Sequence, residues 1–245
     1  MTETRTAAKI GMLVPFTNTN LEPDFELMRP PNTTIHFQRM GGYDVDEIPG
    51  SDQMAGLGAS DISYDLRMIS GVRPDVVLYG CTSATLTHGP SFDADLAEKI
   101  KTGSGAVSLT AAGSLIAGLK AIGATKVGFS SPYLGEINEQ AMAFLKSNGI
   151  DTVNCADVGR ELGNYGQGEL TPDEVFELGC QADHPDAQAI VLSCTDMRSV
   201  EVVERIEATL GKPVVTSNQA MMFCLMQALD LPRHDRLPGR LFDQL

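Results

Sequence analysis

The chain has 245 residues, of which 42% are hydrophobic, and it carries a formal net charge of −14 at pH 7. This length allows one large domain or two small ones, and the apolar fraction excludes an intrinsically disordered protein. The acidic balance argues against a nucleic-acid partner, whose backbone requires clustered Lys and Arg, and no apolar run approaches the roughly 18–20 residues of a membrane span.

The opening stretch MTETRTAAK lacks the apolar run of a secretory signal, which predicts a cytoplasmic protein. Disulfides are not expected in that compartment, and the five cysteines include no C-x-x-C pair, so we expect no metal site. Cys155, Cys180 and Cys224 lie in surroundings typical of core positions. Cys81 and Cys194 differ, because each follows an apolar run and precedes a threonine.

Strand-like and helix-like segments alternate along the first half of the chain. We predict strands at 9–16, 33–40, 75–80 and 106–110, with 33–40 at a sheet edge because its apolar residues alternate. We predict helices at 52–71, around 91–102 and at 114–123.

The second half shows the same alternation. The predicted strands are 126–133, 151–158, 189–193 and 213–217, and the predicted helices are 136–149, 199–211 and 218–231. A further helix is expected to start at Thr171-Pro-Asp-Glu174, which combines a cap, a proline at the first helical position and a glutamate three residues after the cap. The stretch GNYGQG (163–168) predicts a flexible loop that can act as a lid.

The two halves read as copies of one unit. Lys9-Ile10-Gly11 corresponds to Lys126-Val127-Gly128, and the pair Cys81-Thr82 corresponds to Cys194-Thr195. Alternating strands and helices predict an α/β fold with parallel sheets covered on both faces, and ligands bind such sheets at the carboxyl ends of the strands. Both cysteines occupy that position.

A thiol between a strand and a helix faces backbone N–H groups and the positive end of the helix dipole, so we expect a lowered pKa for both cysteines. The same groups can grip a substrate carboxylate, helped by neighbouring side chains. No Arg or Lys lies in these turns, so the grip is expected to be dipolar. The side chains that can donate to the carboxylate are Asn18, Thr82, Ser83, Tyr133 and Thr195. The alternative is that each cysteine is a small core residue ending a buried strand.

The chain resembles the aspartate/glutamate racemase superfamily, and within it the branch of maleate cis–trans isomerases and arylmalonate decarboxylases. The resemblance spans roughly residues 9–231. It is carried by VPFTNTNLE (14–22), GCTSAT (80–85), SPYLGEIN (131–138), Asn164, LSCTD (192–196) and KPVVTSNQA (212–220).

The resemblance implies two pseudo-symmetric, flavodoxin-like (Rossmann-like) parallel-sheet halves, with one cofactor-free active site between them. It implies a first half of residues 8–110 plus 218–240, with the C-terminal helix crossing back, and a second half of residues 111–217. A homodimer or homotetramer is the expected assembly.

The resemblance also implies roles for individual residues. Cys81 and Cys194 match the paired catalytic cysteines of the isomerases and racemases. Asn18, Tyr133 and Asn164 match residues that hold substrate carboxylates in maleate isomerases. Thr82, Ser83 and Tyr133 match the carboxylate donors of the decarboxylases.

Two departures narrow the activity. Decarboxylases of this branch have glycine at the position of Cys81, and maleate isomerases have apolar residues rather than Thr-Ser after their first cysteine. We therefore expect a cofactor-independent two-cysteine isomerase of a small mono- or dicarboxylic acid, either a cis–trans isomerase resembling maleate isomerase or a racemase. The alternatives are an arylmalonate-type decarboxylase that uses one cysteine as proton donor, and a non-catalytic protein that binds small acids.

Overall fold

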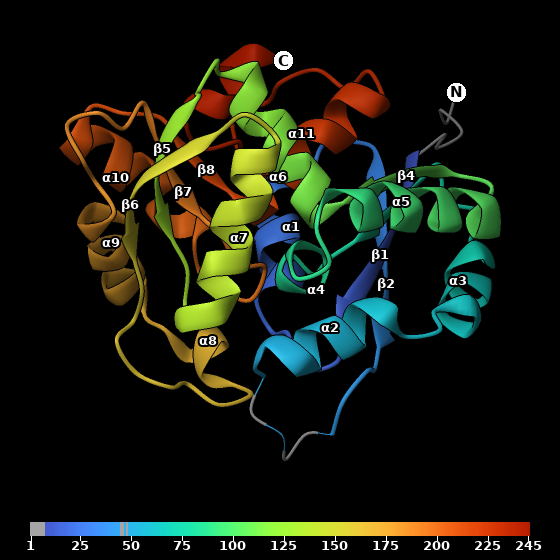
Figure 1. Cartoon of the computed structure of the whole chain (residues 1–245). Coiled ribbons are helices and arrows are strands. Elements are labelled where there is room, and N and C mark those ends of the chain that lie inside the picture. The colour runs from blue at the N-terminus through green and yellow to red at the C-terminus, as the bar shows by residue number, and fades with distance from the viewer. Residues whose placement is uncertain (1–7, 45–46, 48) are drawn as a thin grey trace.

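The structure is a computed structural model that describes residues 8–44, 47 and 49–245, and it contains two four-stranded parallel sheets in that part of the chain (Figure 1). The first sheet consists of β1 (Ala8–Pro15), β2 (Thr33–Met40), β3 (Val76–Tyr79) and β4 (Val107–Thr110). The second sheet consists of β5 (Lys126–Ser130), β6 (Asp151–Ala156), β7 (Ala189–Leu192) and β8 (Val214–Thr216).

The strand order is the same in both sheets, which confirms the predicted internal repeat. The first sheet has the order β2-β1-β3-β4 and the second β6-β5-β7-β8, so the second strand of each half lies at an edge. The edge position predicted for 33–40 is therefore correct. The inner strands β3 and β7 are buried at every residue, as expected where helices cover both faces.

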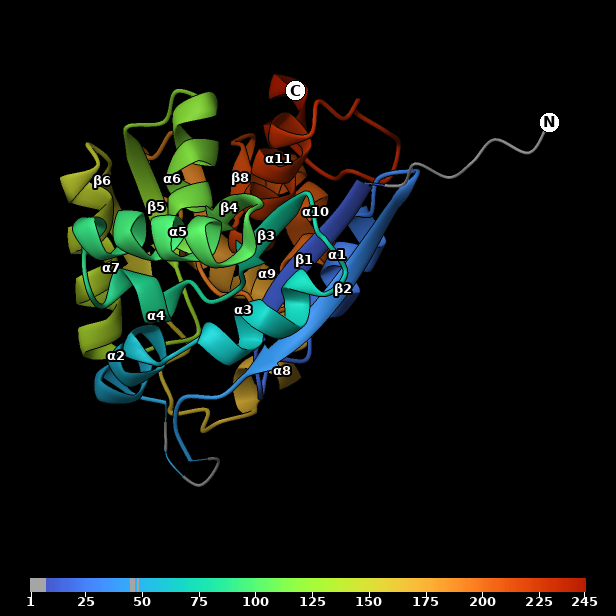
Figure 2. The same ribbon diagram turned by 90° about the vertical axis from the view of Figure 1, so that its right-hand side faces the viewer.

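Helices fill the layers around the sheets (Figure 2). Those before and between the strands of the first sheet are α1 (Leu21–Met28), α2 (Ser51–Ala59), α3 (Ser63–Ser70), α4 (Ser83–Leu86) and α5 (Pro90–Ser104). Those that follow are α6 (Ala111–Ala121), α7 (Gly135–Ser147), α8 (Gly166–Glu169), α9 (Pro172–Gln181), α10 (Val203–Leu210) and α11 (Ser217–Ala228), with short 3₁₀ helices η1 (Val200–Val202) and η2 (Arg240–Gln244). The predicted capping box at Thr171 is present at the start of α9.

Two predictions of secondary structure need correction. The single helix expected over 52–71 is two helices, because Ser60 has an extended backbone (ψ 153°) and the Asp61 carboxylate accepts hydrogen bonds from both N and Oγ of Ser63. These bonds start a new helix rather than continue the old one. The glycine-rich stretch 163–168 is not all loop, since α8 begins at Gly166.

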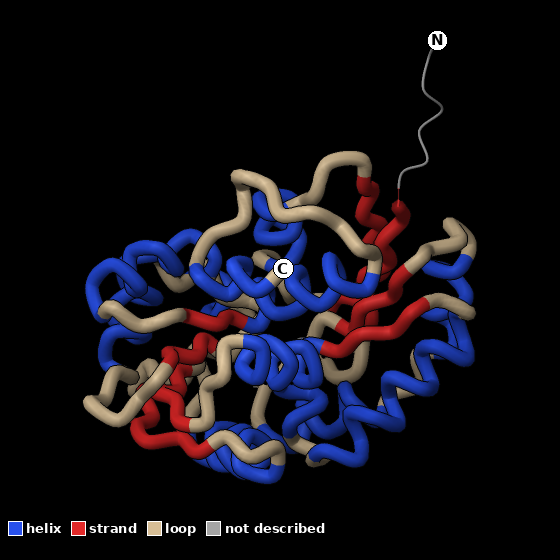
Figure 3. The backbone as a smooth tube through the Cα atoms, turned by 90° about the horizontal axis from the view of Figure 1, so that it is seen from above, coloured by secondary structure: helices blue, strands red, loops and turns tan. Residues whose placement is uncertain are grey.

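The two helices that follow the fourth strand of each sheet, α6 and α11, pack against each other between the sheets (Figures 1 and 2). Each follows the fourth strand of its sheet and is capped by a threonine: Thr110 Oγ1 accepts from Gly113 N, and Thr216 Oγ1 accepts from Gln219 N. Seen from above, the two groups of strands lie on opposite sides of these helices (Figure 3). Helix α11 contacts β3 and β4 as well as α6, but the division into residues 8–110 plus 218–240 and residues 111–217 stays a prediction.

Replacement of Gly128 by alanine tests the packing of α9 on the second sheet. An added Cβ at Gly128 would lie 2.1 Å from the carbonyl oxygen of Ala182, a backbone atom that cannot move aside without shifting the end of α9. We expect the variant to lose about 1–3 kcal/mol of unfolding free energy, measured by urea denaturation. Gly41→Ala is the matched control, because nothing lies within 4 Å of its added Cβ. Equal stability of the two variants would contradict this packing.

Candidate active site

The turns that follow four parallel strands meet at one place between the two sheets. Asn18 follows β1, Cys81 follows β3, Tyr133 follows β5 and Cys194 follows β7. All four turns therefore lie at carboxyl ends of strands, where parallel sheets bind ligands. The repeat places the two cysteines after equivalent strands of the two halves.

A chain of polar contacts connects the two sulfur atoms. Cys81 Sγ lies 3.7 Å from Ser83 Oγ, and Ser83 Oγ lies 3.4 Å from Tyr133 Oη. Tyr133 Oη in turn lies 3.5 Å from Cys194 Sγ. The two thiols thus share one hydroxyl bridge formed by Ser83 and Tyr133.

A small cavity of about 30 Å³ opens beside Cys81, with room for about one water molecule. The predicted site residues Asn18, Cys81, Tyr133, Asn164 and Thr195 all line it. No Lys or Arg is among its lining residues in the described part of the chain, in line with the dipolar grip predicted from the turns.

Three predicted residues lie outside the wall of this cavity. Cys194 is 2% exposed, and its sulfur contacts the hydroxyl of Tyr133, which does line the cavity. Ser83 contacts Cys81 and Tyr133 but does not line the cavity itself. The hydroxyl of Thr82 points elsewhere, because it donates to Ser217 Oγ at 2.9 Å.

The hydroxyl of Thr195 joins three of the converging turns. It donates to the carbonyl oxygen of Gly80 at 2.9 Å and accepts from Asn18 Nδ2 at 3.1 Å. Asn18 Oδ1 accepts from the backbone N–H groups of Asn20 and Leu21, which fixes the orientation of its amide. Gly80, which precedes Cys81, is therefore hydrogen-bonded to Thr195, which follows Cys194.

Asp196 is a functional candidate that the sequence reasoning did not single out, although it follows the second Cys-Thr pair directly. It lines the cavity, and its Oδ1 accepts from Thr19 N at 2.8 Å and from Asn20 N and Nδ2 at 3.1 Å. Burial raises the pKa of this carboxyl despite these donors. Tyr43 and Gln167 also line the cavity; Gln167 lies in the glycine-rich stretch 163–168, whereas no motif in the sequence indicates Tyr43.

The prediction of lowered thiol pKa values is wrong. Burial raises the pKa of Cys81 and raises that of Cys194 to about 12. Backbone N–H groups do contact both sulfurs, and they oppose this effect without overcoming it. The physical reason is that α4 has only four residues, and Cys194 is followed by a loop and a short 3₁₀ helix, so neither sulfur faces a long helix dipole.

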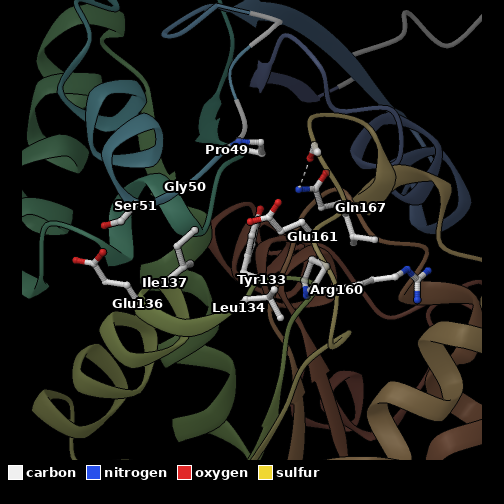
Figure 4. A pocket seen from close by; sticks show the side chains of 13 residues that line it. Pro49, Gly50, Ser51, Tyr133, Leu134, Glu136, Ile137, Arg160, Glu161 and Gln167 are labelled. Carbon is white, nitrogen blue, oxygen red and sulfur yellow. Dashed lines mark hydrogen bonds between the residues drawn. The ribbon is translucent and has the colours of Figure 1, made fainter.

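A larger outer chamber of about 230 Å³ adjoins the small cavity (Figure 4). Pro49, Tyr133 and Gln167 line both spaces, so they form the wall between them. Arg160 also lines the chamber, but its guanidinium binds Glu174 at 3.0 Å and extends away from Tyr133 in Figure 4.

A hydrogen bond connects two loop segments that border the small cavity and the outer chamber. Asn164 Nδ2 donates to the carbonyl oxygen of Glu47 at 2.5 Å, which links the loop before α8 to the segment between β2 and α2. Within the described ranges, no group of three or more His, Cys, Asp or Glu residues is arranged to hold a metal ion, and no helix there is long and apolar enough to cross a membrane.

Comparison of the sequence with known proteins identifies the family of this chain. A family model described as arylmalonate decarboxylase matches residues 10–242. The maleate isomerase of Geobacillus stearothermophilus is 28% identical over 240 residues, covering 91% of this chain and 92% of that protein. The maleate isomerase of Nocardia farcinica is 29% identical over 246 residues, covering 96% of each.

A solved structure shows that the fold is shared as well. It is a cysteine-to-serine mutant of the Nocardia farcinica maleate cis–trans isomerase with a covalently bound succinylcysteine intermediate. It superposes with a TM-score of 0.88 at 24% identity, covering 97% of this chain and 99% of that one. Because the family model covers nearly the whole sequence, the chain belongs to the arylmalonate decarboxylase family, in the branch of the aspartate/glutamate racemase superfamily that also contains the maleate isomerases.

Proposed function

We propose that this protein is a cofactor-independent isomerase of a small carboxylic acid, with Cys81 and Cys194 as its two catalytic groups. The observation that carries the proposal is the bridge Cys81–Ser83–Tyr133–Cys194, which places two thiols on one chain of hydrogen-bonding groups beside a cavity. The two relatives named above as maleate isomerases support the same reaction class.

In the cis–trans version, the Cys81 thiolate forms a bond to one alkene carbon, and the π electrons move to the neighbouring carbon, where Cys194 delivers a proton. The former double bond is now single and rotates. Cys194 then removes that proton, the double bond reforms and the Cys81 thiolate leaves. The succinylcysteine intermediate of the Nocardia structure supports this sequence of steps.

In the racemase version, no bond to sulfur forms. One thiolate takes the α-proton, the electron pair is delocalised into the carboxylate as an enediolate, and the other thiol returns a proton to the opposite face. Ser83 supports this version, because its hydroxyl lies beside the Cys81 sulfur at a position where the sequence pattern of maleate isomerases has an apolar residue.

In both versions the carboxylate is held by neutral donors. Tyr133 Oη and Ser83 Oγ can turn from the sulfurs to the substrate, and Asn18 Nδ2 has a second hydrogen beyond the one given to Thr195. A cavity of about 30 Å³ does not hold a four-carbon acid, so binding requires Tyr133 to move toward the outer chamber. That movement also exposes Cys194, whose sulfur Tyr133 now covers.

A decarboxylase that uses Cys194 as proton donor is a second candidate. The raised pKa of Cys194, about 12, keeps this thiol protonated at neutral pH, as a proton donor requires. Release of carbon dioxide from a disubstituted malonate that does not depend on Cys81 would favour this reaction.

We also propose a cytoplasmic location and a homodimeric or homotetrameric assembly. All five cysteines are free thiols, and a reaction that depends on two of them is suited to a reducing compartment. Exposed apolar side chains at Tyr64 and Met68 on α3 are compatible with an interface between copies.

Removal of either sulfur should abolish most turnover. With a substrate identified by proton NMR among small dicarboxylates, malonates and 2-substituted acids, we expect Cys81→Ala and Cys194→Ala to lower kcat by about 100- to 10,000-fold, because each removes an acid–base group or nucleophile. Cys155→Ala is the matched control, since that thiol lies on the edge strand β6 and is exposed rather than in the core as predicted. Full activity in both site variants would refute a two-cysteine mechanism.

The two versions of the reaction are separated by running it in deuterated water. Racemisation places deuterium at the α-carbon of the recovered acid, because the returning proton exchanges with solvent. Conversion of maleate to fumarate indicates addition and rotation. A 2-substituted acid recovered without deuterium, together with unchanged maleate, would contradict both versions.

The raised pKa of Cys194 gives an expectation for thiol chemistry. Only the thiolate is alkylated, and its fraction rises about tenfold per pH unit below the pKa. We expect alkylation of Cys194 by iodoacetamide, followed by mass spectrometry, to increase with pH without a plateau up to about pH 9. A plateau near neutral pH would contradict the raised pKa of Cys194 and would show that a hydrogen-bond donor not named here stabilises its thiolate.

A further inference from the structure

A buried carboxyl group lies one side chain away from the turn of Cys194. Asp24, on α1, is 2% exposed, and its Oδ2 accepts a hydrogen bond of 2.7 Å from Asn218 Nδ2 at the start of α11. The same nitrogen donates to the carbonyl oxygen of Thr195 at 3.1 Å. One amide therefore connects Asp24 to the backbone of the residue that follows Cys194.

Only one of the two polar atoms of the Asn218 amide group has hydrogen-bond partners among the described residues. Both of its hydrogens have acceptors, which fixes which terminal atom is nitrogen, while Oδ1 has no donor among the described residues. Asn218 is completely buried, and a buried carbonyl without a donor carries a free-energy penalty. A protonated Asp24 carboxyl that accepts from Nδ2 still has one hydrogen to offer the neighbouring Oδ1, and an ionised carboxyl has none.

We propose that Asp24 is a positioning residue of the active site: as a neutral acid it pairs with the Asn218 amide, and this pair holds the Thr195 carbonyl and the Cys194 turn in place. Ionisation removes the proton that Asn218 Oδ1 needs and sets the carboxylate against that oxygen. The turn then loosens, so the arrangement of Cys194 depends on pH. The proposal rests on Cys194 being one of the two catalytic thiols.

The charges around Asp24 agree with a neutral acid. Burial raises the pKa of Asp24 to about 7, and the negative charges of Glu201 and Asp196 act in the same direction. The hydrogen bond from Asn218 and the charge of Arg198 oppose them. Arg198 is already paired with Glu201 through bonds of 2.7 and 3.0 Å, which limits its effect on Asp24.

The residues just before α1 also contact the turn that follows Cys194. Thr19 and Asn20 donate to the Asp196 carboxylate, and Asn18 donates to the Thr195 hydroxyl. Asp24 thus completes a set of contacts through which α1 and the turn before it hold Thr195 and Asp196, the two residues that follow Cys194.

Asp24→Asn is the informative variant, because an asparagine can accept from Asn218 Nδ2 and donate to Oδ1 at every pH. In the folded native protein, Asp24 keeps its proton up to about pH 7, whereas in the unfolded chain it loses the proton at about pH 3.8. Its contribution to stability therefore falls as pH rises from about 4 to about 7 and is then constant. We expect the Tm of Asp24→Asn minus that of the native protein to grow by several degrees between about pH 5 and about pH 8. An infrared band of a protonated carboxyl group near pH 6 should be lost in the variant.

Alkylation of Cys194 separates a positioning role from a purely structural one. In the native protein, ionisation of Asp24 near pH 7 loosens the turn that buries Cys194, so the alkylation rate should rise more steeply with pH around that pH, and in Asp24→Asn the rise should be uniform. Asp24→Ala cannot bond to Asn218, so its rate of Cys194 alkylation should differ from that of the native protein at every pH. Asp93→Asn is the matched control: this carboxyl is also largely buried with a raised pKa, but it is bonded to Thr110 at the start of α6.

Each outcome decides the question. Identical pH profiles of Tm and of Cys194 alkylation in the native protein and Asp24→Asn would overturn the proposal, and so would a change in Tm alone or an equal effect of Asp93→Asn on alkylation. Neither measurement uses a substrate. A failure of the proposed isomerase reaction would appear in the turnover of Cys81→Ala and Cys194→Ala, and is therefore distinguishable from a failure here.

Discussion

The site depends on one hydroxyl group that bridges two separate sheets. Thr195 Oγ1, in the turn after β7, donates to the Gly80 carbonyl in the turn after β3 and accepts from Asn18 in the turn after β1. Within the described residues the sheets share no strand pairing, so such contacts, together with the packing of α6 on α11, determine how far apart the two thiols lie. Thr195 is only 4% exposed, and a buried hydroxyl with both a donor and an acceptor resists rearrangement.

The fold and the cysteine positions could be predicted because their signals are local. Buried parallel strands are short apolar runs bounded by turn residues, and the duplication let each half support the interpretation of the other. The turn positions of Cys81 and Cys194 follow from where those runs end. The break at Ser60 is harder to predict, because it depends on which of several polar side chains bonds to the backbone ahead of the next helix, here the Asp61 carboxylate to Ser63.

The chemistry of the site was less predictable, because it depends on burial and on contacts distant in sequence. A cysteine at a strand end indicates a lowered pKa only if a helix follows and water remains near. Here the surrounding side chains remove the water, and desolvation raises both pKa values. The hydroxyl of Thr82 bonds to Ser217, which is 135 residues away. The link from Asp24 to Asn218 spans 194 residues, and no short motif contains both.

Two buried thiols that interact electrostatically are suited to work as an unequal pair. The charge of a Cys81 thiolate is one of the causes that raise the pKa of Cys194, so the first ionisation disfavours the second. The site then carries at most one thiolate, with the other sulfur protonated. Either version of the isomerase requires this state, because one sulfur must act as base or nucleophile while the other supplies a proton. Asp196 and a bound carboxylate add negative charge and strengthen the same restriction, so the acidic, water-poor surroundings that make each thiol a weak acid also keep the pair in two different protonation states.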